Sequence, residues 1–440
     1  MLPTPRLLVL LLLGAVVVAG ASFAAPLTWI AVLYFVALFG LLVTDLILTP
    51  RPDQLAVKRT TEPKLSLGAD NLVQIEIANR SARPVVFELR DEYPYQFQVD
   101  AAFLHGTIEA LDHIELRYHV HPFARGDYTF GAVNLRYRST LGTFRRQARY
   151  DGGSPEEAAV RVYPNVLDVR KYDLMARKGL LEELGLRHVR SSGAGTEFER
   201  LRDYTTDDEF RRINWKATAR RSRPIAVEYE TERSQHVVYV LDTGRLMRPP
   251  IGELAKLDYA INAALLASYV ATLRGDQVGL LTFADEVGVY LHPAKGRGQF
   301  YSMLELLYNV RSEPVEADYG RALSYLSLKN KRRSLIVIFT DLVTLDAAKP
   351  LIAYTARLAL RHLPLVVTMH DPNIAALANQ PAASASAVYQ RAVAEQLIDE
   401  RQVILDTLSN AGVLTLDVEA DKLSIAVINK YLELKSRSVL

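Results

Sequence analysis

The sequence predicts three parts in order: a two-helix membrane hairpin, a β-sandwich-like domain, and a doubly wound α/β domain. Three patterns carry this prediction, namely a long uncharged N-terminal stretch, a period-two alternation of apolar and polar residues, and short apolar runs separated by helical patterns. The expected boundaries are residues 1–50 for the hairpin, 51–160 for the β-rich domain, 161–235 for a connecting segment and 236–440 for the α/β domain.

The uncharged stretch extends from Leu7 to Thr44 and contains no Asp, Glu, Lys, Arg or His. A single helix over this stretch would be about 57 Å long, whereas the hydrocarbon core of a bilayer is about 30 Å thick. Pro26 lies near the middle and favours a break. We therefore expect two transmembrane helices, at about 7–25 and 28–48.

The flanking cations predict the orientation of this hairpin. Arg6 precedes the first helix, Arg51 and Lys58 follow the second, and the expected turn has no cation. The positive-inside rule then places both ends, and everything after residue 50, in the cytoplasm. The alternative is a cleaved signal peptide with small residues at 19–21, which would place the bulk of the chain outside. We favour the uncleaved hairpin, because the second apolar stretch would stop transfer.

Residues 58–149 show the alternation that is typical of β-strands. Val73, Ile75 and Ile77 alternate with polar residues, and turn-forming residues follow at 79–84. Further strands are expected at 85–89, 114–120 and 128–130. These intervals predict a β-sandwich of about 90 residues.

The C-terminal half alternates strands with helices. Continuous apolar runs are typical of strands buried on both faces of a parallel sheet, and they occur at 236–241, 278–283, 335–340, 365–369 and 413–416. Apolar residues at helical spacing cover 254–273 and about 300–310, 347–361, 386–409 and 421–434. This alternation predicts a doubly wound α/β sheet.

Four of these strands are followed by an acidic residue: Asp242, Asp341, Asp371 and Asp417. Ligands of open parallel sheets bind at the carboxyl ends of the strands, beside the point where the strand order reverses. Asp242 and Asp341 are thus candidates for holding a hydrated divalent cation or a polar group of a partner. The alternative, that each Asp caps the next helix, is favoured for all four and most strongly for Asp371 and Asp417.

A dense mixture of cations, acids and aromatic residues occupies positions 193–233. The mixture fits an ion-pair network better than a phosphate-binding track, and Gly193 and Gly195 do not complete a phosphate-binding motif. The ordered residues of this segment are Glu197, Phe198, Arg202, Tyr204, Asp207, Asp208, Arg211, Asn214, Trp215, Lys216, Arg220 and Glu228. On these residues the chain resembles the bacterial family called domain of unknown function 58, and we take them as its signature and as candidate partner contacts.

The resemblance implies an architecture and a partner. Members of that family have two N-terminal spans, a β-rich domain, the signature, and a von Willebrand factor A-like domain. The resemblance also implies a bacterial inner-membrane location as a multi-pass protein, a partnership with MoxR-type AAA+ ATPases, and a role in maturing envelope or other protein complexes. It implies no established activity.

A von Willebrand factor A-like domain often holds Mg²⁺ through Asp-x-Ser-x-Ser, a later Thr and a later Asp. This sequence offers only Asp242 and Asp341, because Gly244 and Leu246 occupy the two Ser positions and no Thr is apparent near 298–299. Mg²⁺ requires near-octahedral oxygen ligation. We therefore expect no cofactor, with a degenerate Mg²⁺ site as the alternative, and Arg245 could place a cation where the metal would lie.

Composition and missing motifs narrow the function. The 440 residues carry a net charge of +2 and no Cys, so nothing points to nucleic acid, and disulfides, Cys-ligated metals and thiol nucleophiles are excluded. No P-loop, His-Glu-x-x-His or Gly-x-Ser-x-Gly motif is present. We expect a membrane-anchored, non-enzymatic interaction or scaffold protein. Two alternatives stay open: a metal-assisted hydrolase using Asp242 and Asp341 with Asp207 or Asp208, and an exoplasmic ligand-binding protein.

Overall fold

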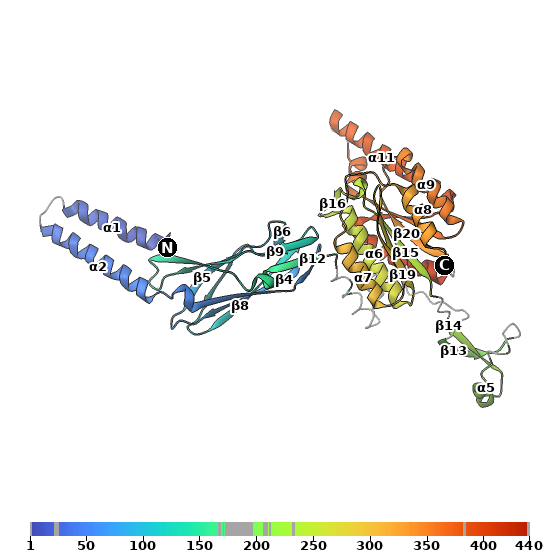
Figure 1. The fold of residues 1–440 in the computed structure, drawn as a ribbon. Coiled ribbons are helices and arrows are strands. Elements are labelled where there is room, and N and C mark those ends of the chain that lie inside the picture. The colour runs from blue at the N-terminus through green and yellow to red at the C-terminus, as the bar shows by residue number, and fades with distance from the viewer. Residues whose placement is uncertain are drawn as a thin grey trace. The chain divides into compact units, whose positions relative to one another are not determined.

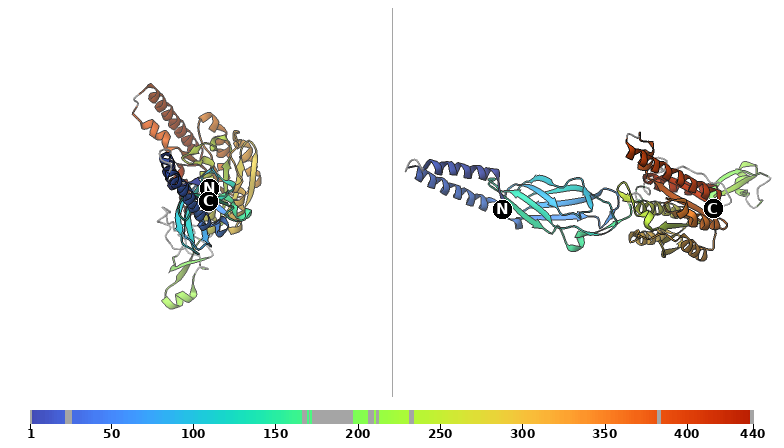
Figure 2. Two further views of the ribbon diagram at one scale, coloured as in Figure 1. Left: turned by 90° about the vertical axis from the view of Figure 1, so that its left-hand side faces the viewer. Right: turned by 90° about the horizontal axis from the view of Figure 1, so that it is seen from above.

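A computed structural model describes residues 2–21, 26–165, 169, 171, 197–205, 210, 213–230, 234–381 and 384–437. The chain divides into two compact units, Met1–Tyr163 and Pro164–Leu440. Figures 1 and 2 show the helical and β-rich parts of the first unit and the α/β part of the second. We describe each unit by itself.

Two apolar helices open the first unit: α1 (Pro5–Ala21) and α2 (Pro26–Leu48). They pack side by side because Gly14 leaves room on α1. A Cβ atom at Gly14 would come within 2.9 Å of the rings of Tyr34 and Phe35 on α2. The Tyr34 hydroxyl also donates a hydrogen bond to the carbonyl oxygen of Leu10, at 2.6 Å.

The predicted two-helix membrane hairpin was wrong. Among the described residues only one helical stretch, Thr28–Gln54, is long and apolar enough to cross a membrane. Helix α1 has 17 residues, which cover about 26 Å and fall short of a hydrocarbon core of about 30 Å. The chain before α1 is not helical either, since strand β1 (Leu2–Pro3) pairs with β11 (Phe144–Tyr150). A multi-pass location is therefore not supported, and one candidate spanning helix near the N-terminus remains.

The predicted β-sandwich was also wrong, because the β-rich part contains three sheets. The five-stranded sheet has the order β1-β11-β10-β5-β7, the four-stranded sheet β2-β4-β8-β6, and the three-stranded sheet β3-β12-β9. The third sheet forms because β12 adds in parallel to β3, far from it in sequence. The remaining bounds are β2 (Leu55–Thr61), β3 (Lys64–Ser66), β4 (Asn71–Asn79), β5 (Val85–Asp91), β6 (Phe97–Val99), β7 (Leu104–Ile108), β8 (His113–Pro122), β9 (Gly126–Thr129), β10 (Val133–Arg138), α3 (Pro155–Ala158) and β12 (Ala159–Tyr163).

The core of the β-rich part contains a buried ion pair. Alternating residues of β4, such as Ile75 and Ile77, are fully buried, as the period-two pattern predicts. Among them the Arg59 guanidinium donates to Asp91 from Nε at 2.9 Å, and the Tyr118 hydroxyl donates to the same carboxylate at 2.6 Å. Burial raises the pKa of Tyr118, and the Asp91 charge raises it further, so this hydroxyl stays a donor.

The end of α2 is fixed to the turn between β10 and β11. The buried carboxylate of Asp45 accepts hydrogen bonds from the Ser139 hydroxyl at 2.6 Å, the Leu141 amide at 2.7 Å and the Thr143 amide at 3.2 Å. From the other side of the turn, the Thr4 hydroxyl donates to the Thr143 carbonyl at 2.9 Å. The turn therefore holds both the start of α1 and the end of α2.

The second unit is mixed α/β, built on a six-stranded sheet of order β19-β18-β15-β20-β21-β22. All neighbouring strands are parallel except β18 and β19, which are antiparallel. The strands are β15 (His236–Asp242), β18 (Gln277–Phe283), β19 (Val287–Ala294), β20 (Ser334–Phe339), β21 (Leu363–His370) and β22 (Leu414–Glu419); a small ribbon pairs β16 (Pro250–Ile251) with β17 (Leu254–Ala255). The helices are α6 (Lys256–Leu273), α7 (Arg297–Tyr308), α8 (Tyr319–Lys329), α9 (Leu345–Ala359), α10 (Pro372–Asn379), α11 (Ala385–Asn410) and α12 (Leu423–Ser436).

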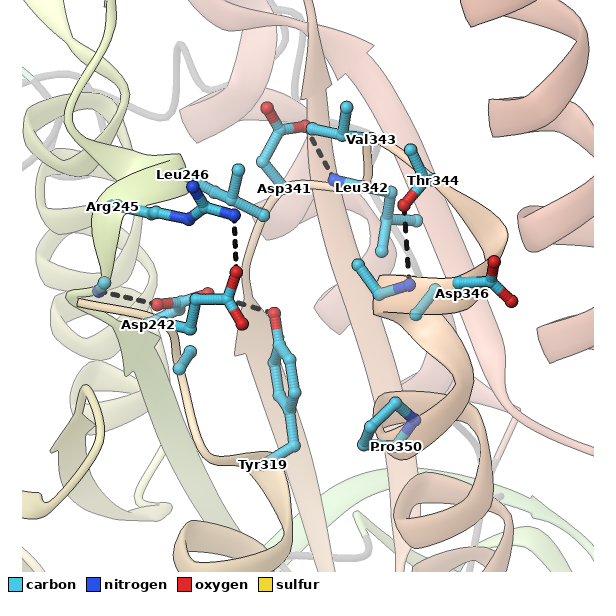
Figure 3. Close-up of a pocket in the computed structure, with 15 residues that line it drawn as sticks. Asp242, Arg245, Leu246, Tyr319, Asp341, Leu342, Val343, Thr344, Asp346 and Pro350 are labelled. Atoms are coloured by element: carbon cyan, nitrogen blue, oxygen red, sulfur yellow. Dashed lines mark hydrogen bonds and ion pairs between the residues drawn. The ribbon is translucent and has the colours of Figure 1, made fainter. Parts of the chain in front are cut away.

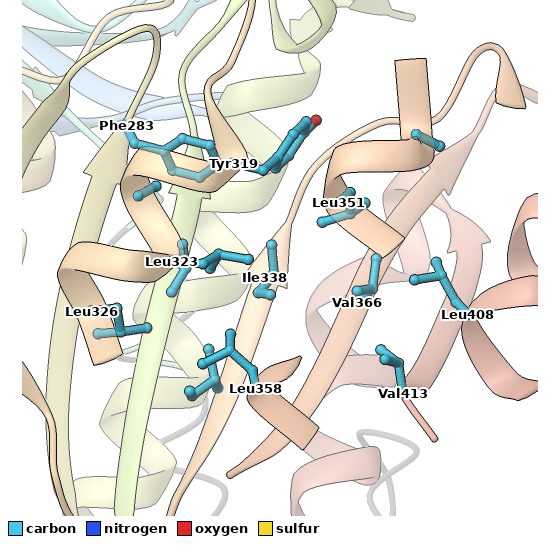
Figure 4. Packing of buried hydrophobic residues seen from close by; sticks show 14 of the residues in the cluster. Phe283, Tyr319, Leu323, Leu326, Ile338, Leu351, Leu358, Val366, Leu408 and Val413 are labelled. Carbon is cyan, nitrogen blue, oxygen red and sulfur yellow. The ribbon is translucent and has the colours of Figure 1, made fainter. Parts of the chain in front are cut away.

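Helices cover both faces of this sheet (Figures 1 and 2). On one face α8, α9 and α11 bury Leu323, Leu351 and Leu408 against strand residues such as Ile338 and Val366 (Figure 4). Helix α6 packs with α7 and with α12, and it lies against β15 and β18. Every residue of β15 and β20 is buried, which explains why the sequence shows unbroken apolar runs there.

The strand order reverses beside β15. The chain goes from β15 to β18 and β19 on one side, then crosses to β20 on the other side. Leu241 pairs with Phe339 in the parallel register. Asp242 and the segment Thr340–Asp341 therefore leave the sheet next to one another, at its carboxyl edge.

Candidate functional site

A cavity of about 350 Å³ lies at this carboxyl edge. Its lining comes from three segments, 242–246 after β15, 316–319 at the start of α8, and 341–350 between β20 and α9. Figure 3 shows Asp242 and Tyr319 pointing toward one another, with Asp341 at the end of the neighbouring strand. The two strand-end acids singled out from the sequence thus line one cavity.

In the described part of the chain, the donors that bind Asp242 are neutral. Its side chain is buried, and Oδ1 accepts a hydrogen bond from the Gly244 amide at 2.7 Å. Its Oδ2 accepts from the Thr340 hydroxyl at 2.7 Å and from the Tyr319 hydroxyl at 3.1 Å, and these two hydroxyls lie 2.8 Å apart. Burial raises the pKa of Asp242 above its ordinary value, and the neighbouring Asp341 adds to this, while the hydrogen bonds oppose it.

Asp341 is held by two cations instead. Its Oδ2 accepts from the Lys256 ammonium at 2.5 Å, and its Oδ1 accepts from Arg401 Nη1 at 2.9 Å and from the Leu342 amide at 2.8 Å. Lys256 is the first residue of α6, whereas Arg401 lies within α11. Three segments that are distant in sequence therefore meet on one buried carboxylate.

Arg401 extends this network to the last strand. Its Nη2 donates to Asp417 at 2.7 Å and to the Met369 carbonyl at 2.8 Å. Burial opposes the charge of Arg401, but its bonds to Asp417 and Asp341 prevail and raise its pKa. Asp417 is partly buried, yet its bonds from Arg401 and Thr368 lower its pKa, so this pair stays ionised.

The helix-cap interpretation holds for one of the outer acids and was wrong for the other. Asp371 caps α10 by accepting a hydrogen bond from the Asn373 amide at 2.9 Å. Asp417 caps no helix, because it lies within β22 and binds Arg401. A strand-end position in sequence does not distinguish a cap from a partner of a distant cation.

These surroundings do not suit a Mg²⁺ ion. The metal needs about six oxygen ligands in near-octahedral geometry, and both oxygens of Asp341 already face ammonium or guanidinium groups. In the described part of the chain, no group of three His, Cys, Asp or Glu side chains is placed to hold a metal. Arg245, which the sequence suggested as the replacing cation, instead pairs with Glu316 on the surface. The cations that bind Asp341 are Lys256 and Arg401.

Sequence reasoning missed four residues of this site: Thr340, Tyr319, Lys256 and Arg401. For the first three a signal existed. Thr340 directly precedes Asp341, while Tyr319 and Lys256 begin helices, and helices of a doubly wound sheet begin at the carboxyl edge. Arg401 carried no such signal, because it lies mid-helix beside Asp399 and Glu400, where a solvated charge is the ordinary expectation.

The signature segment forms a hairpin with a short helix. Strands β13 (Glu197–Asp203) and β14 (Ile225–Glu230) pair antiparallel, and α5 (Trp215–Arg221) lies between them in sequence. Phe198 and Arg202 are on β13 and Glu228 is on β14. The backbone amide of Tyr204 closes the hairpin by donating to the Pro224 carbonyl at 3.0 Å. Asp207, Asp208 and Arg211 lie outside the described residues.

The helix of the signature carries exposed aromatic and basic side chains. Asn214 caps α5 by accepting from the Ala217 amide at 3.0 Å. Trp215 is 59% exposed and packs edge-on against Phe210, with ring centroids 5.4 Å apart. Lys216 and Arg220 follow on the same short helix, and both are exposed. Much of the signature is therefore local hairpin structure, with an aromatic and basic surface.

Comparison with known proteins covers the signature and this sheet. Residues 200–387 match the family model described as protein of unknown function DUF58. The DUF58 match includes Asp242, Tyr319 and Asp341, but ends before Arg401. The resemblance seen in the sequence is thus supported for this part of the chain.

The relatives found carry no assigned activity. Uncharacterized proteins of Mycobacterium tuberculosis and Mycobacterium bovis are each 27% identical over 184 residues, which is 41% of this chain and 56% of theirs. The match therefore spans little more than half of these relatives. Among solved structures, the conserved hypothetical protein BatB from Bacteroides thetaiotaomicron matches 47% of this chain at 12% identity and a TM-score of 0.33. Proximal thread matrix protein 1 from the mussel byssus matches 46% at 12% identity and a TM-score of 0.30.

Proposed function

We propose that this chain is a non-enzymatic interaction protein that docks a partner protein at the carboxyl edge of its six-stranded sheet. The observation that carries the proposal is the complete internal pairing of Asp341 with Lys256 and Arg401. A carboxylate that is neutralised in this way offers no ligand to a metal and no base to a substrate. The surface that this edge offers to a partner is therefore the cavity and its rim.

The rim of the cavity has the mixed chemistry of a protein-binding surface. The side chains of Arg245 and Glu316 are 58% and 78% exposed, and Asp346 is more exposed still. Apolar Leu246 and Val343 also line the cavity. Exposed charges around an apolar patch favour recognition of another protein, since the charges select the partner while apolar contacts supply affinity.

A MoxR-type AAA+ ATPase is the partner that we propose. The support comes from the signature, through which the chain resembles domain of unknown function 58, and from the von Willebrand factor A-like arrangement that this resemblance implies. We further propose that α2 tethers the chain to the bacterial inner membrane. Arg51 and Lys58 follow this helix, so the positive-inside rule favours a cytoplasmic position for the rest.

A metal-assisted hydrolase has less support. It would need Asp242 and Asp341 to share a cation, yet one accepts hydrogen bonds from hydroxyls and an amide, and the other faces two positive side chains. Displacing Lys256 and Arg401 would leave two partly buried cations without Asp341, which costs several kcal/mol.

Site-specific photo-crosslinking tests the proposed docking. A photoreactive amino acid replaces Thr344 at the cavity rim of the full-length chain in its native membrane, and crosslinked products are identified by mass spectrometry with ATP or ADP present. We expect a crosslink to an AAA+ ATPase that Arg245→Glu weakens. The same probe at Arg391 on α11, outside the cavity lining, is the matched control. Crosslinks equally strong from both positions, or none to an ATPase, would contradict the proposal.

Two further measurements separate the alternatives. Titration of Mg²⁺ into the purified full-length chain should release no saturable heat. Saturable binding that Asp242→Ala abolishes would instead favour the hydrolase. Protease digestion of right-side-out and inverted vesicles tests the orientation, and a C-terminus digested in right-side-out vesicles would favour the exoplasmic alternative.

A further inference from the structure

A second cavity, of about 470 Å³, lies between the C-terminal ends of α8 and α9. Both helices begin at the carboxyl edge of the sheet, where Tyr319 and Ala347 line the first cavity. They run back along the sheet, and their last turns reach its amino edge, where β20 begins at Ser334 and β21 at Leu363. We call this second cavity the amino-edge groove. Its lining residues all fall within 323–328 and 354–362.

The floor of the amino-edge groove is apolar and so is part of its rim. Leu323 and Leu358 are buried and belong to the core cluster beneath the sheet (Figure 4). In contrast, the side chains of Leu328 and Leu360 are 74% and 84% exposed. Two exposed leucines beside a cavity with an apolar floor form an apolar patch. Covering this patch with a partner removes apolar surface from water, which favours binding.

The charge on the rim has one sign. Arg357 and Arg361 line the groove and are exposed, and neither forms an ion pair with any residue that the structure describes. His362 is buried, and burial together with Arg361 lowers its pKa, so the positive charge of the groove comes from the two arginines. The surrounding segments 319–340 and 347–370 contain no Asp or Glu, and they add cations at Lys329, Lys331, Arg332 and Arg333.

We propose that the amino-edge groove docks a segment of a partner protein in which leucine-like side chains alternate with carboxylates. Leu328 and Leu360 would contact the apolar side chains of that segment. Arg357 and Arg361 would each bind a carboxylate, since a guanidinium pairs with a carboxylate through two parallel hydrogen bonds. An apolar groove with cations on its rim suits an amphipathic acidic segment, and it disfavours a basic one.

This inference is independent of the proposed function at the carboxyl edge. The two cavities share α8 and α9 but no lining residue. A partner at the amino-edge groove could be a second site of the same protein or another protein, and its chemistry is fixed by the groove alone. If crosslinking from Thr344 failed, the proposal for the amino-edge groove would still stand. If peptide binding at the groove failed, the proposed docking at the carboxyl edge would still stand.

Selection from a displayed library of random peptides tests the inference on the full-length chain in detergent. We expect enriched peptides to contain Leu or Phe next to Asp or Glu. Their affinity should fall at least about tenfold with Arg357→Glu/Arg361→Glu, and separately with Leu328→Ser/Leu360→Ser. The matched control is Lys349→Glu, which reverses a charge on α9 outside the groove lining and should leave the affinity unchanged.

The outcomes divide clearly. Peptides that lack acids, peptides whose affinity none of these variants changes, or the absence of any enriched peptide would overturn the proposal. Light scattering tests whether a second copy of this chain occupies the groove instead. A dimer that Leu328→Ser/Leu360→Ser dissociates would show that the groove is a self-association surface, which would also overturn the assignment to a partner segment. Unchanged thermal unfolding of each variant confirms that the fold is intact.

Discussion

Asp341 at the carboxyl edge of the six-stranded sheet and the two arginines at its amino edge lie in opposite electrostatic environments. At the carboxyl edge, Asp341 is buried and each of its oxygens has a cation within hydrogen-bonding distance. At the amino edge, Arg357 and Arg361 are exposed, and no described residue forms an ion pair with either. A charge that is paired inside the fold becomes costly when its partner is removed, whereas a charge on the surface can bind another molecule. The same two helices, α8 and α9, therefore lie between the buried ion pairs of Asp341 and the proposed amino-edge docking surface.

Removing the carboxylate at the carboxyl edge should have the largest effect. Asp341→Asn leaves the Lys256 ammonium and part of the Arg401 guanidinium buried without their counter-charge, and we expect a loss of about 3 kcal/mol. Hydrogen exchange of the β15 and β20 amides measures this loss locally. Asp346→Asn, on the exposed rim of the same cavity, is the control and should leave exchange unchanged. An equally small effect of Asp341→Asn would mean that the cations do not depend on this carboxylate.

Removing one of the neutral hydrogen-bond donors of Asp242 should reduce stability less than Asp341→Asn does. Tyr319→Phe deletes the hydroxyl that donates to Asp242 at 3.1 Å, and hydrogen bonds to charged groups are worth about 1.5 to 3 kcal/mol. We expect a loss near the lower value, because the Thr340 hydroxyl still donates to the same oxygen. The exposed Tyr301→Phe serves as the control. A loss that matched Asp341→Asn would contradict the distinction between neutral and charged partners.

The pH dependence of Asp242 sharpens the comparison further. Burial, aided by the charge of Asp341, raises the pKa of Asp242 in the folded state above its ordinary value of 3.8. The folded state then binds this proton more tightly than the unfolded state, so the contribution of Asp242 to stability falls as the pH rises from about 4 through the folded-state pKa. Asp242→Asn cannot titrate and should lack this fall. The free energy of unfolding of Asp242→Asn should therefore rise relative to that of the wild type as the pH increases. A difference between the two that stays constant with pH would contradict the raised pKa of Asp242.

Substitutions on the amino-edge rim should have the smallest effect on stability. Leu328→Ser and Leu360→Ser remove exposed side chains, and such changes usually stay within about 0.5 kcal/mol. Leu326→Ala, two residues before Leu328 on α8 but in the core, should cost about 2 to 5 kcal/mol. Thermal unfolding of the three variants distinguishes a docking surface from a part of the core. If the serine variants unfold as early as Leu326→Ala, these leucines serve the fold rather than a partner.

Sequence patterns predicted the α/β part better than the first unit. Unbroken apolar runs marked β15 and β20, and the parallel sheet then placed Asp242 beside Asp341, which the cavity lining bears out. Arg401 could not be foreseen, because its position depends on how α11 packs across β21 and β22. In the first unit, uncharged length alone predicted two spans, but it did not reveal that α1 would stop at 17 residues. Period-two alternation marked the strands but not the third sheet, because the pairing of β12 with β3 is a long-range contact.

The seating of α2 on the β10–β11 turn has a mechanical consequence. The carboxylate of Asp45 accepts hydrogen bonds from Ser139, Leu141 and Thr143 of that turn. Just beyond the helix, the Tyr137 hydroxyl of β10 donates to the Pro50 carbonyl at 2.8 Å. The segment between α2 and β2 is itself hydrogen-bonded to β10 and β11, through the Pro50 and Pro52 carbonyls. A force on the strands of the β-rich part is therefore transmitted directly to the last turn of α2. We expect such a force to tilt the helix, because no flexible linker lies between them to extend.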